Sequence, residues 1–122
     1  MSPRDVVTTV IEALRHNDTP HENSGIELTY KFASPANKRM TGPLEHFKAM
    51  ILNPLYGPML HHRGASYENL KVEGDTARID VILLSRDGRY VGYRFVLSRQ
   101  HGNRYEGCWM TDAVIRFEVP ST

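Results

Sequence analysis

The chain has 122 residues, of which 40% are hydrophobic and 24% are charged, and its formal net charge at pH 7 is +1. This composition is typical of a soluble globular domain and excludes a disordered tail, a collagen-like repeat and a coiled-coil rod. The longest apolar run is too short to cross a bilayer, and the near-neutral charge lacks the surplus of Lys and Arg that binding to nucleic-acid phosphates needs. We therefore expect a single domain over residues 1–122, with neither a membrane nor a nucleic acid as its partner.

The single cysteine, Cys108, has no partner for an intrachain disulfide bond. No neighbouring group is expected to lower the pKa of its thiol, so we expect a buried and inert side chain. The first residues also show no basic segment followed by an apolar one, which a secretory leader would have. Together these features predict a reducing, cytoplasmic location.

The first half of the chain contains three segments with the pattern of a helix start: a capping residue, a proline and, two positions later, an acid. These segments begin at Ser2, Thr19 and Gly42. They predict helices that begin near residues 3, 20 and 43 and end, in order, at residues 17–18, near Phe32 and before Pro54. In the first segment the apolar residues recur at helical spacing, which predicts an amphipathic helix.

The second half of the chain changes from helical spacing to alternation of apolar and polar residues. This pattern predicts strands at about 65–73, 76–85, 89–100 and 104–118, separated by short turns that suit hairpins. Consecutive hairpins make an antiparallel meander. The expected fold class is therefore α+β, with three N-terminal helices packed on a curved antiparallel sheet of four or more strands.

Alternate residues of a strand share one face, so the spacing also predicts which residues meet the helices. The expected helix-packed set is Ala77, Ile79, Val81, Leu83, Val91, Tyr93, Phe95, Leu97, Trp109, Thr111, Ala113, Ile115 and Phe117. The opposite face carries Ile82, Val96, Met110 and Val114 among charged residues, more apolar surface than a water-facing sheet normally has. We therefore expect a homodimer that forms through this outer face.

Three helices followed by a long-stranded, curved antiparallel sheet resemble the nuclear-transport-factor-2-like fold, a cone shared by ketosteroid isomerases, polyketide cyclases and many non-catalytic domains. Within this layout, residues 32–38 (FASPANK), 41–44 (TGPL) and 109–112 (WMTD) are similar to those of a domain-of-unknown-function family, domain of unknown function 4864. The resemblance implies a cone over nearly the whole chain. It implies no particular reaction, because this fold hosts catalysts and binding domains alike.

The inner face of such a cone would offer aromatic rings and hydroxyl groups but no acid, because Asp80 and Asp112 are expected to project outward. His46 is the titratable group that could reach the mouth of the cone. The candidate pocket residues are Tyr30, His46, Phe47, Tyr93, Phe95, Trp109 and Thr111. The alternative is that these rings form only the packed core.

The segment after Phe32 also has two interpretations. Ser34 precedes a proline, which disfavours helical backbone there, so the second helix must end at about this residue. The segment is then either a connector that sets the angle between two helices, or a rim loop whose Asn37, Lys38 and Arg39 contact an acidic ligand.

The six histidines show no zinc-ligand spacing, so we expect no metal and no cofactor. The first functional hypothesis is a non-catalytic domain that binds a small ligand or a protein partner. The alternative is a cofactor-free isomerase, cyclase or hydrolase that acts on a small apolar molecule inside the cone. An ionisable residue at the floor of the pocket would favour the enzyme, whereas a floor of apolar and aromatic groups would favour binding.

Overall fold

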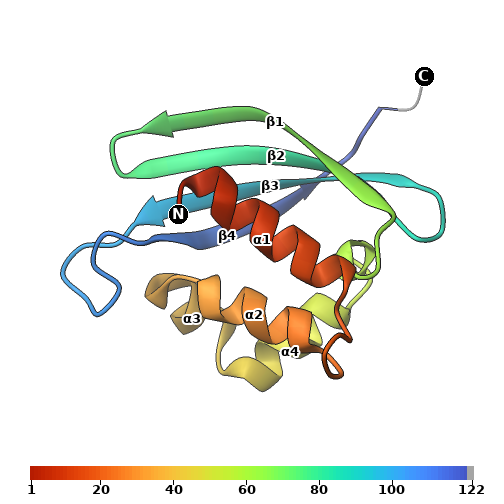
Figure 1. Ribbon diagram of the computed structural model, residues 1–122, viewed down its shortest axis with the longest axis horizontal. Coiled ribbons are helices and arrows are strands. Elements are labelled where there is room, and N and C mark those ends of the chain that lie inside the picture. Colours follow the sequence, from red (N-terminus) through yellow and green to blue (C-terminus); the bar gives the residue numbers. More distant parts are fainter. Residues whose placement is uncertain (121–122) are drawn as a thin grey trace.

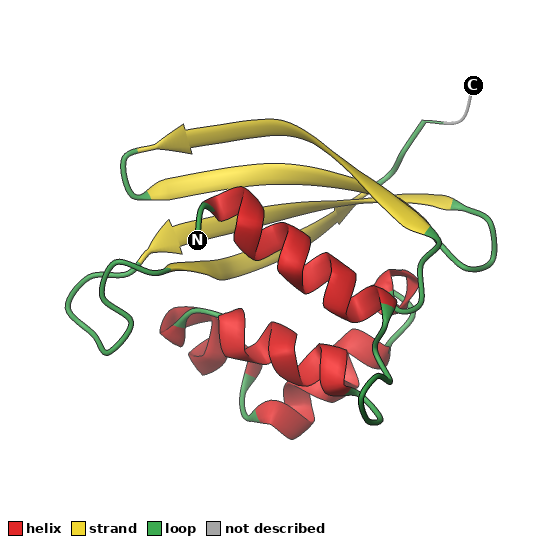
Figure 2. Ribbon diagram, viewed as in Figure 1, coloured by secondary structure: helices red, strands yellow, loops and turns green. Residues whose placement is uncertain are grey.

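The computed structural model describes residues 1–120, so the last two residues of the predicted domain lie outside the described part of the chain. The helices are α1 (Pro3–Arg15), α2 (Ser24–Phe32), α3 (Pro35–Thr41), α4 (Leu44–Leu52) and the short 3-10 helix η1 (Gly57–Met59). The strands are β1 (Gly64–Glu73), β2 (Thr76–Leu84), β3 (Tyr90–Arg99) and β4 (Trp109–Phe117). The helices all lie on one side of a long, twisted sheet (Figures 1 and 2), which confirms the expected α+β layout.

Helix α1 begins where the capping signal predicts. The Ser2 hydroxyl oxygen accepts a hydrogen bond from the Asp5 N–H at 3.1 Å, and the Asp5 carboxylate accepts one from the Ser2 N–H at 3.0 Å. This reciprocal capping box satisfies two of the free N–H groups at the helix start. The apolar stripe of α1 is buried against the sheet and the other helices, and it consists of Val6, Val7, Val10, Ile11 and Leu14.

Helix α2 begins at Ser24 and not near residue 20, so the predicted start of the second helix is wrong. The capping residue of α2, Asn23, has φ 61° and its side chain makes no capping hydrogen bond. Instead, the Asn17 side chain accepts a hydrogen bond from the Ile26 N–H at 2.9 Å and donates one to the Asn23 side chain at 2.9 Å. The cap of α2 therefore comes from the residue that follows α1, and the local pattern at Thr19 does not initiate the helix.

The segment after Phe32 ends α2 as expected but then forms a further helix, α3, that the sequence analysis did not predict. Ser34 is extended, and its hydroxyl accepts a hydrogen bond from the Asn37 N–H at 3.2 Å. Pro35 occupies the first turn, where its missing N–H leaves no donor unpaired. This is the capping-residue-and-proline pattern of the other predicted starts, except that no acid follows the proline.

The sheet has the predicted meander order β1-β2-β3-β4, with all neighbours antiparallel. Strand β4 begins at Trp109, later than predicted, because residues 100–108 form a loop with left-handed Gly102 (φ 77°) and Gly107 (φ 79°). Cys108 lies at the end of this loop and is exposed, so the expectation of a buried thiol is wrong.

A β-bulge in β4 reverses the faces expected for its second half. Thr111 pairs with Leu97 and Ala113 pairs with Val96, which leaves Asp112 as an extra residue in β4. One extra residue in a strand moves each later side chain of that strand to the opposite face of the sheet. Consequently Trp109 and Thr111 face the helices as expected, but Ala113, Ile115 and Phe117 share the outer face, whereas Val114 and Arg116 face the helices.

The two edge strands of the sheet differ in what lies beside them. At the β4 edge, Ala33 forms a parallel bridge with Thr111, whose carbonyl accepts hydrogen bonds from the Ser34 N–H (2.8 Å) and the Asn37 side chain (3.1 Å). At the β1 edge, the register shifts between Glu68 and Lys71. Asn69, inside this irregularity, has φ 56°.

The outer face carries an ion pair whose carboxylate is buried and whose arginine is partly exposed. Asp80 is 4% exposed, and its carboxylate accepts hydrogen bonds from the Arg94 guanidinium at 2.7 and 3.1 Å and from the Asn69 side chain at 3.0 Å. The Arg94 bonds lower the pKa of Asp80. Asp112 instead accepts a hydrogen bond from the Ser98 hydroxyl at 3.0 Å. Asp80 thus faces outward, as expected, and is the cross-strand partner of Arg94.

Candidate functional site

A cavity of about 290 Å³ lies between α2, α3, α4 and the helix-facing side of β3 and β4; we call it the helix–sheet cavity. Its apolar walls are Leu14, Phe47, Met50, Ile51, Met59, Phe95 and Val114. Its polar lining residues include Thr29, Asn37, Thr41, Tyr56, Thr111 and Asp112. A mostly apolar lining with a few polar groups is typical of sites that bind small organic molecules.

Two stacked tyrosines hold the chain between α4 and η1 against β3 and β4. The Tyr93 hydroxyl donates to the Leu55 carbonyl at 2.7 Å, and the Tyr56 hydroxyl donates to the Val114 carbonyl at 3.1 Å. The two ring centroids are 6.3 Å apart. Burial raises the pKa of Tyr93 to about 12, so its hydroxyl stays a proton donor at neutral pH. These bonds position Tyr56 in the wall of the cavity.

Several polar lining residues of the cavity already have partners within the protein. The hydroxyl of Thr29 donates to the Gly25 carbonyl at 2.8 Å, and that of Thr41 donates to the Asn37 carbonyl at 3.1 Å. The Asn37 side chain donates to the Thr111 carbonyl at 3.1 Å. The Asp112 carboxylate is engaged by Ser98.

Four of the ten predicted site residues line this cavity, and they come from two helices and two strands, α3, α4, β3 and β4. They are Asn37, Phe47, Phe95 and Thr111. Tyr30 lies behind the wall, where its ring packs edge-on against Phe47 at 5.2 Å and its hydroxyl donates to the Gly42 carbonyl. Tyr93 lies in the core, with its hydroxyl bonded to Leu55.

The other predicted residues lie away from the helix–sheet cavity. His46 and Arg39 are exposed, on α4 and α3. The Lys38 ammonium lies over two rings, 5.1 Å from the centroid of Tyr30 and 5.4 Å from that of Tyr105. Trp109 lies at the other end of β4 and has the Arg99 guanidinium 5.6 Å from its ring.

Several residues that line the cavity are not predicted from the sequence. Val114 was assigned to the outer face, and only the bulge at Asp112 turns it inward. Tyr56 and Met59 belong to the segment between α4 and β1, where the sequence predicts no helix or strand. Met50, three residues after Phe47 on α4, also lines the cavity.

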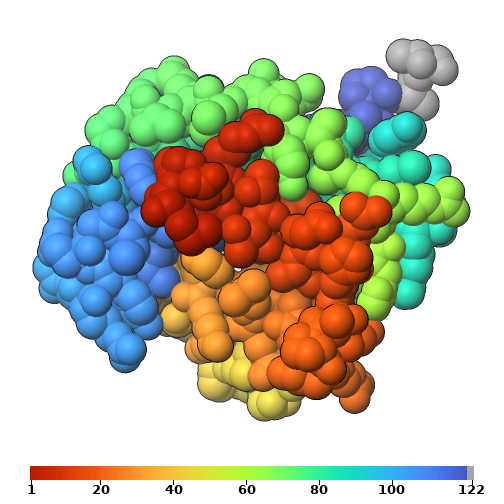
Figure 3. All heavy atoms as spheres, viewed as in Figure 1, coloured from red at the N-terminus to blue at the C-terminus, as the bar shows by residue number. Residues whose placement is uncertain are grey.

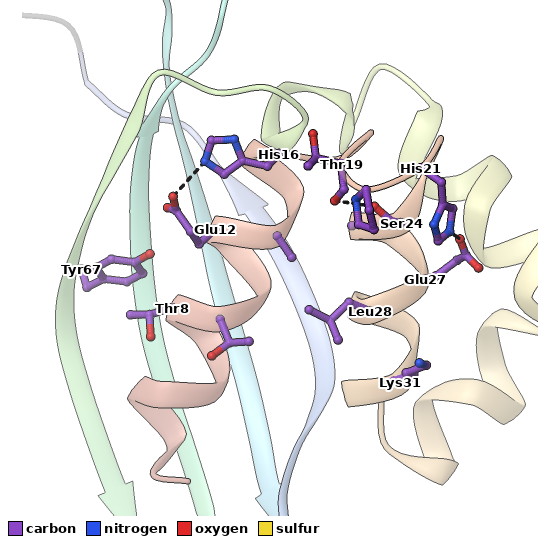
Figure 4. Close-up of a pocket in the computed structure, with 14 residues that line it drawn as sticks. Thr8, Glu12, His16, Thr19, His21, Ser24, Glu27, Leu28, Lys31 and Tyr67 are labelled. Carbon is purple, nitrogen blue, oxygen red and sulfur yellow. Dashed lines mark hydrogen bonds and ion pairs between the residues drawn. The ribbon is translucent and has the colours of Figure 1, made fainter.

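A larger depression, of about 950 Å³, lies between α1 and α2, and we call it the α1–α2 groove (Figure 4). Its two carboxylates are paired with histidines, Glu12 with His16 at 3.2 Å and Glu27 with His21 at 2.7 Å, whereas Lys31, which also lines the groove, is in none of the ion pairs observed among the described residues. In the close-up, Tyr67 and Thr8 lie near Glu12, at the side of the groove away from α2. It is more open to solvent than the helix–sheet cavity, and its carboxylates and imidazoles already satisfy each other.

The remaining histidines lie apart from both sites. His62 is 2% exposed; its Nε2 lies 3.1 Å from the Ile11 carbonyl oxygen, and its Nδ1 has no hydrogen-bond partner among the described residues. His101 bridges Glu106 (2.6 Å) and Asp75 (3.0 Å) on the surface. Within residues 1–120, no group of three His, Cys, Asp or Glu side chains is placed to hold a metal ion.

None of the helices in the described part of the chain is both long enough and apolar enough to span a bilayer. A comparison with curated protein sequences gives no match. A family model described as "Domain of unknown function (DUF4864)" matches residues 2–120. Because the match covers nearly the whole chain, and because it includes the segments 32–38, 41–44 and 109–112, the chain belongs to this family.

Proposed function

We propose that this protein binds a small, largely apolar molecule in the helix–sheet cavity. The observation that carries the proposal is a space of about 290 Å³ walled by apolar side chains of three helices and two strands. Ligand burial in such a space removes apolar surface from water and needs only a few polar groups to orient the molecule. The proposal includes the expected resemblance to the nuclear-transport-factor-2-like cone, which the helical layer over a twisted sheet supports.

The lining favours binding over acid–base catalysis. A general acid or base must reach the substrate with a carboxylate or imidazole that has no stronger partner. Among the described lining residues, the carboxylate is that of Asp112, which accepts a hydrogen bond from Ser98. The hydroxyls of Thr29 and Thr41 donate to helix carbonyls. No observation therefore favours the isomerase, cyclase or hydrolase alternative.

The first test fills the cavity. Val114→Phe places a larger ring at the inner face of β4 and is expected to weaken binding of N-phenyl-1-naphthylamine, an uncharged fluorescent probe, by about ten-fold or more. The measurement is a fluorescence titration of the purified protein with this probe. The matched control is Ile115→Phe, one residue further along the same strand and on the outer face, which is expected to leave the affinity unchanged.

Two outcomes would contradict the proposal: no saturable binding by the unmodified protein, or equal affinities for Val114→Phe and the unmodified protein. Circular dichroism of each variant shows whether it has kept its fold. If Val114→Phe does not fold, Met50→Trp provides a second filling variant from the opposite wall of the cavity.

We also propose that two copies associate through the outer sheet face, in a cytoplasmic setting that the single cysteine supports. The apolar residues on this face are Ile82, Leu84, Tyr90, Val96, Met110, Ala113, Ile115 and Phe117. Phe117 covers Gly92, where a side chain would overlap the Phe117 ring. This packing keeps the Phe117 ring over β3 and extends the apolar surface across both strands.

Light scattering at micromolar concentration tests this association. The unmodified protein is expected to be a dimer, and Ile115→Lys is expected to raise the dissociation constant by about ten-fold or more, because it places a charge in an apolar interface. The control is Leu52→Lys on α4, because Leu52 and Ile115 have similar exposed fractions, 51% and 54%. A monomeric unmodified protein, or equal effects of the two lysines, would contradict the proposal.

A further inference from the structure

A second cavity, of about 230 Å³, lies on the face shown in Figure 3, where the N-terminal residues (red), α2 (orange) and the loop 100–108 (blue) meet; we call it the loop cavity. Most of its lining side chains are apolar or aromatic. They include Val6, Phe32, Tyr105, Trp109 and Met110. The charged lining residue is Lys31, at the C-terminal end of α2, and no carboxylate is among the described lining residues.

Cations also gather around the loop side of this cavity. Tyr105 lies between two of them: the Lys38 ammonium is 5.4 Å and the Arg104 guanidinium 5.1 Å from its ring centroid. Within residues 1–120, none of the observed ion pairs involves Lys31, Lys38 or Arg104. Clustered cations beside a low-dielectric wall create a positive potential that attracts anions.

The acidic groups close in sequence to the lining residues have partners elsewhere. Glu27, one helical turn before Lys31 on α2, pairs with His21 at 2.7 Å. The Asp5 carboxylate, in the first turn of α1, accepts a hydrogen bond from the Ser2 N–H at 3.0 Å. Glu106, next to Tyr105 in the loop, accepts hydrogen bonds from the Gly102 N–H at 2.7 Å and pairs with His101 at 2.6 Å.

We propose that the loop cavity binds a small organic carboxylate with an aromatic or alkyl body. The apolar body would lie against Phe32 and Trp109, and the carboxylate would pair with Lys31 at the end of α2. A volume of about 230 Å³ suits a ligand smaller than a typical drug molecule. The apolar wall supplies affinity, and the unpaired ammonium group supplies preference for an anion over a neutral molecule. This site is separate from the helix–sheet cavity.

The chain offers a direct reporter, because Trp109 is its single tryptophan and lies in the wall of the loop cavity. Phenylbutyrate is the probe, and phenylbutanol is its uncharged counterpart. Titration with phenylbutyrate is expected to change the Trp109 fluorescence saturably, with an affinity about five-fold higher than that of phenylbutanol. Lys31→Met, which keeps an unbranched side chain and removes the charge, is expected to abolish this difference.

Two controls separate this site from the rest of the molecule. Lys48→Met removes an ammonium group of α4 that pairs with Glu45, and it is expected to leave phenylbutyrate binding unchanged. Val114→Phe fills the helix–sheet cavity and is also expected to leave the titration unchanged, so failure of one site does not imply failure of the other. The proposal is overturned if Trp109 fluorescence shows no saturable change, if the two probes bind equally, or if Lys31→Met preserves the preference for phenylbutyrate.

Discussion

Replacing Gly25 by alanine is expected to lower the free energy of unfolding by about 3 kcal/mol or more. A methyl group at this position of α2 would overlap the carbonyl oxygen of Ala13 and lie 2.9 Å from Cα of Asn17. Both are backbone atoms, which cannot rotate away as the end of a flexible side chain can. The two helices would have to separate, and their separation would also strain the Gly25 N–H bond to the Asn17 carbonyl, which is 2.9 Å long.

Urea unfolding followed by circular dichroism measures this loss. The matched control is Gly64→Ala, because nothing lies within 4 Å of a methyl group built at Gly64. This control is expected to change stability by less than about 0.5 kcal/mol. A Gly25→Ala protein as stable as the control would show that α1 and α2 are not in close backbone contact.

The stability of the protein is expected to fall as the pH drops below about 6.5, because His62 is buried in its neutral form. Burial lowers the pKa of His62, and the Ile11 carbonyl and nearby Glu12 offset only part of this effect. The unfolded chain therefore takes up a proton at a higher pH than the folded one. The free energy of unfolding therefore falls as the pH drops below the pKa that His62 has in the unfolded chain. For one proton the fall is at most about 1.4 kcal/mol per pH unit, and it stops once the pH is below the pKa of His62 in the folded protein.

His101 acts in the opposite direction and in a different pH window. The Glu106 hydrogen bond and the Asp75 carboxylate raise the pKa of His101. The stabilisation that protonated His101 provides is fully present below the pKa that His101 has in the unfolded chain. It is lost as the pH rises through the pKa of His101 in the folded protein. The two histidines together predict a stability maximum near pH 6.5 for the histidine-dependent part of the curve.

Unfolding free energies measured at steps between pH 5 and pH 7 test the role of His62. His62→Gln is expected to remove the slope on the acidic side, even if the variant is less stable at every pH. The control is His16→Gln, because the His16 side chain is 60% exposed and its loss is expected to leave that slope in place. An unchanged acidic slope in His62→Gln would assign the pH dependence to other groups.

The sequence predicts the fold where the signals are local. The alternation and the turn residues place β1, β2 and β3 within one residue of their observed ends, and the capping box places the start of α1. The start of α2 is not predictable in this way, because its cap is supplied by Asn17, nine residues before the Ile26 N–H that it binds. The bulge at Asp112 is likewise hidden, because it is defined by the register between β4 and β3.

In the candidate site, too, the sequence predicts the local features and not those that depend on distant residues. Alternation correctly predicts that Phe95 and Thr111 face the helices, and both line the helix–sheet cavity. It does not predict the position along the strand, so it grouped Trp109 with them although Trp109 lies at the loop cavity. Alternation places Val114 on the wrong face of the sheet, because the bulge adds one residue to β4 just before it.

The two edges of the sheet limit how copies of this protein can aggregate. An unpaired strand edge normally recruits a strand from another molecule, which begins edge-to-edge association. At the β4 edge, the Thr111 carbonyl is occupied by Ser34 and Asn37 of the same chain. At the β1 edge, left-handed Asn69 interrupts the ladder between the charged residues Glu68 and Lys71. Both edges therefore carry local features that disfavour continuous pairing with a strand of another molecule.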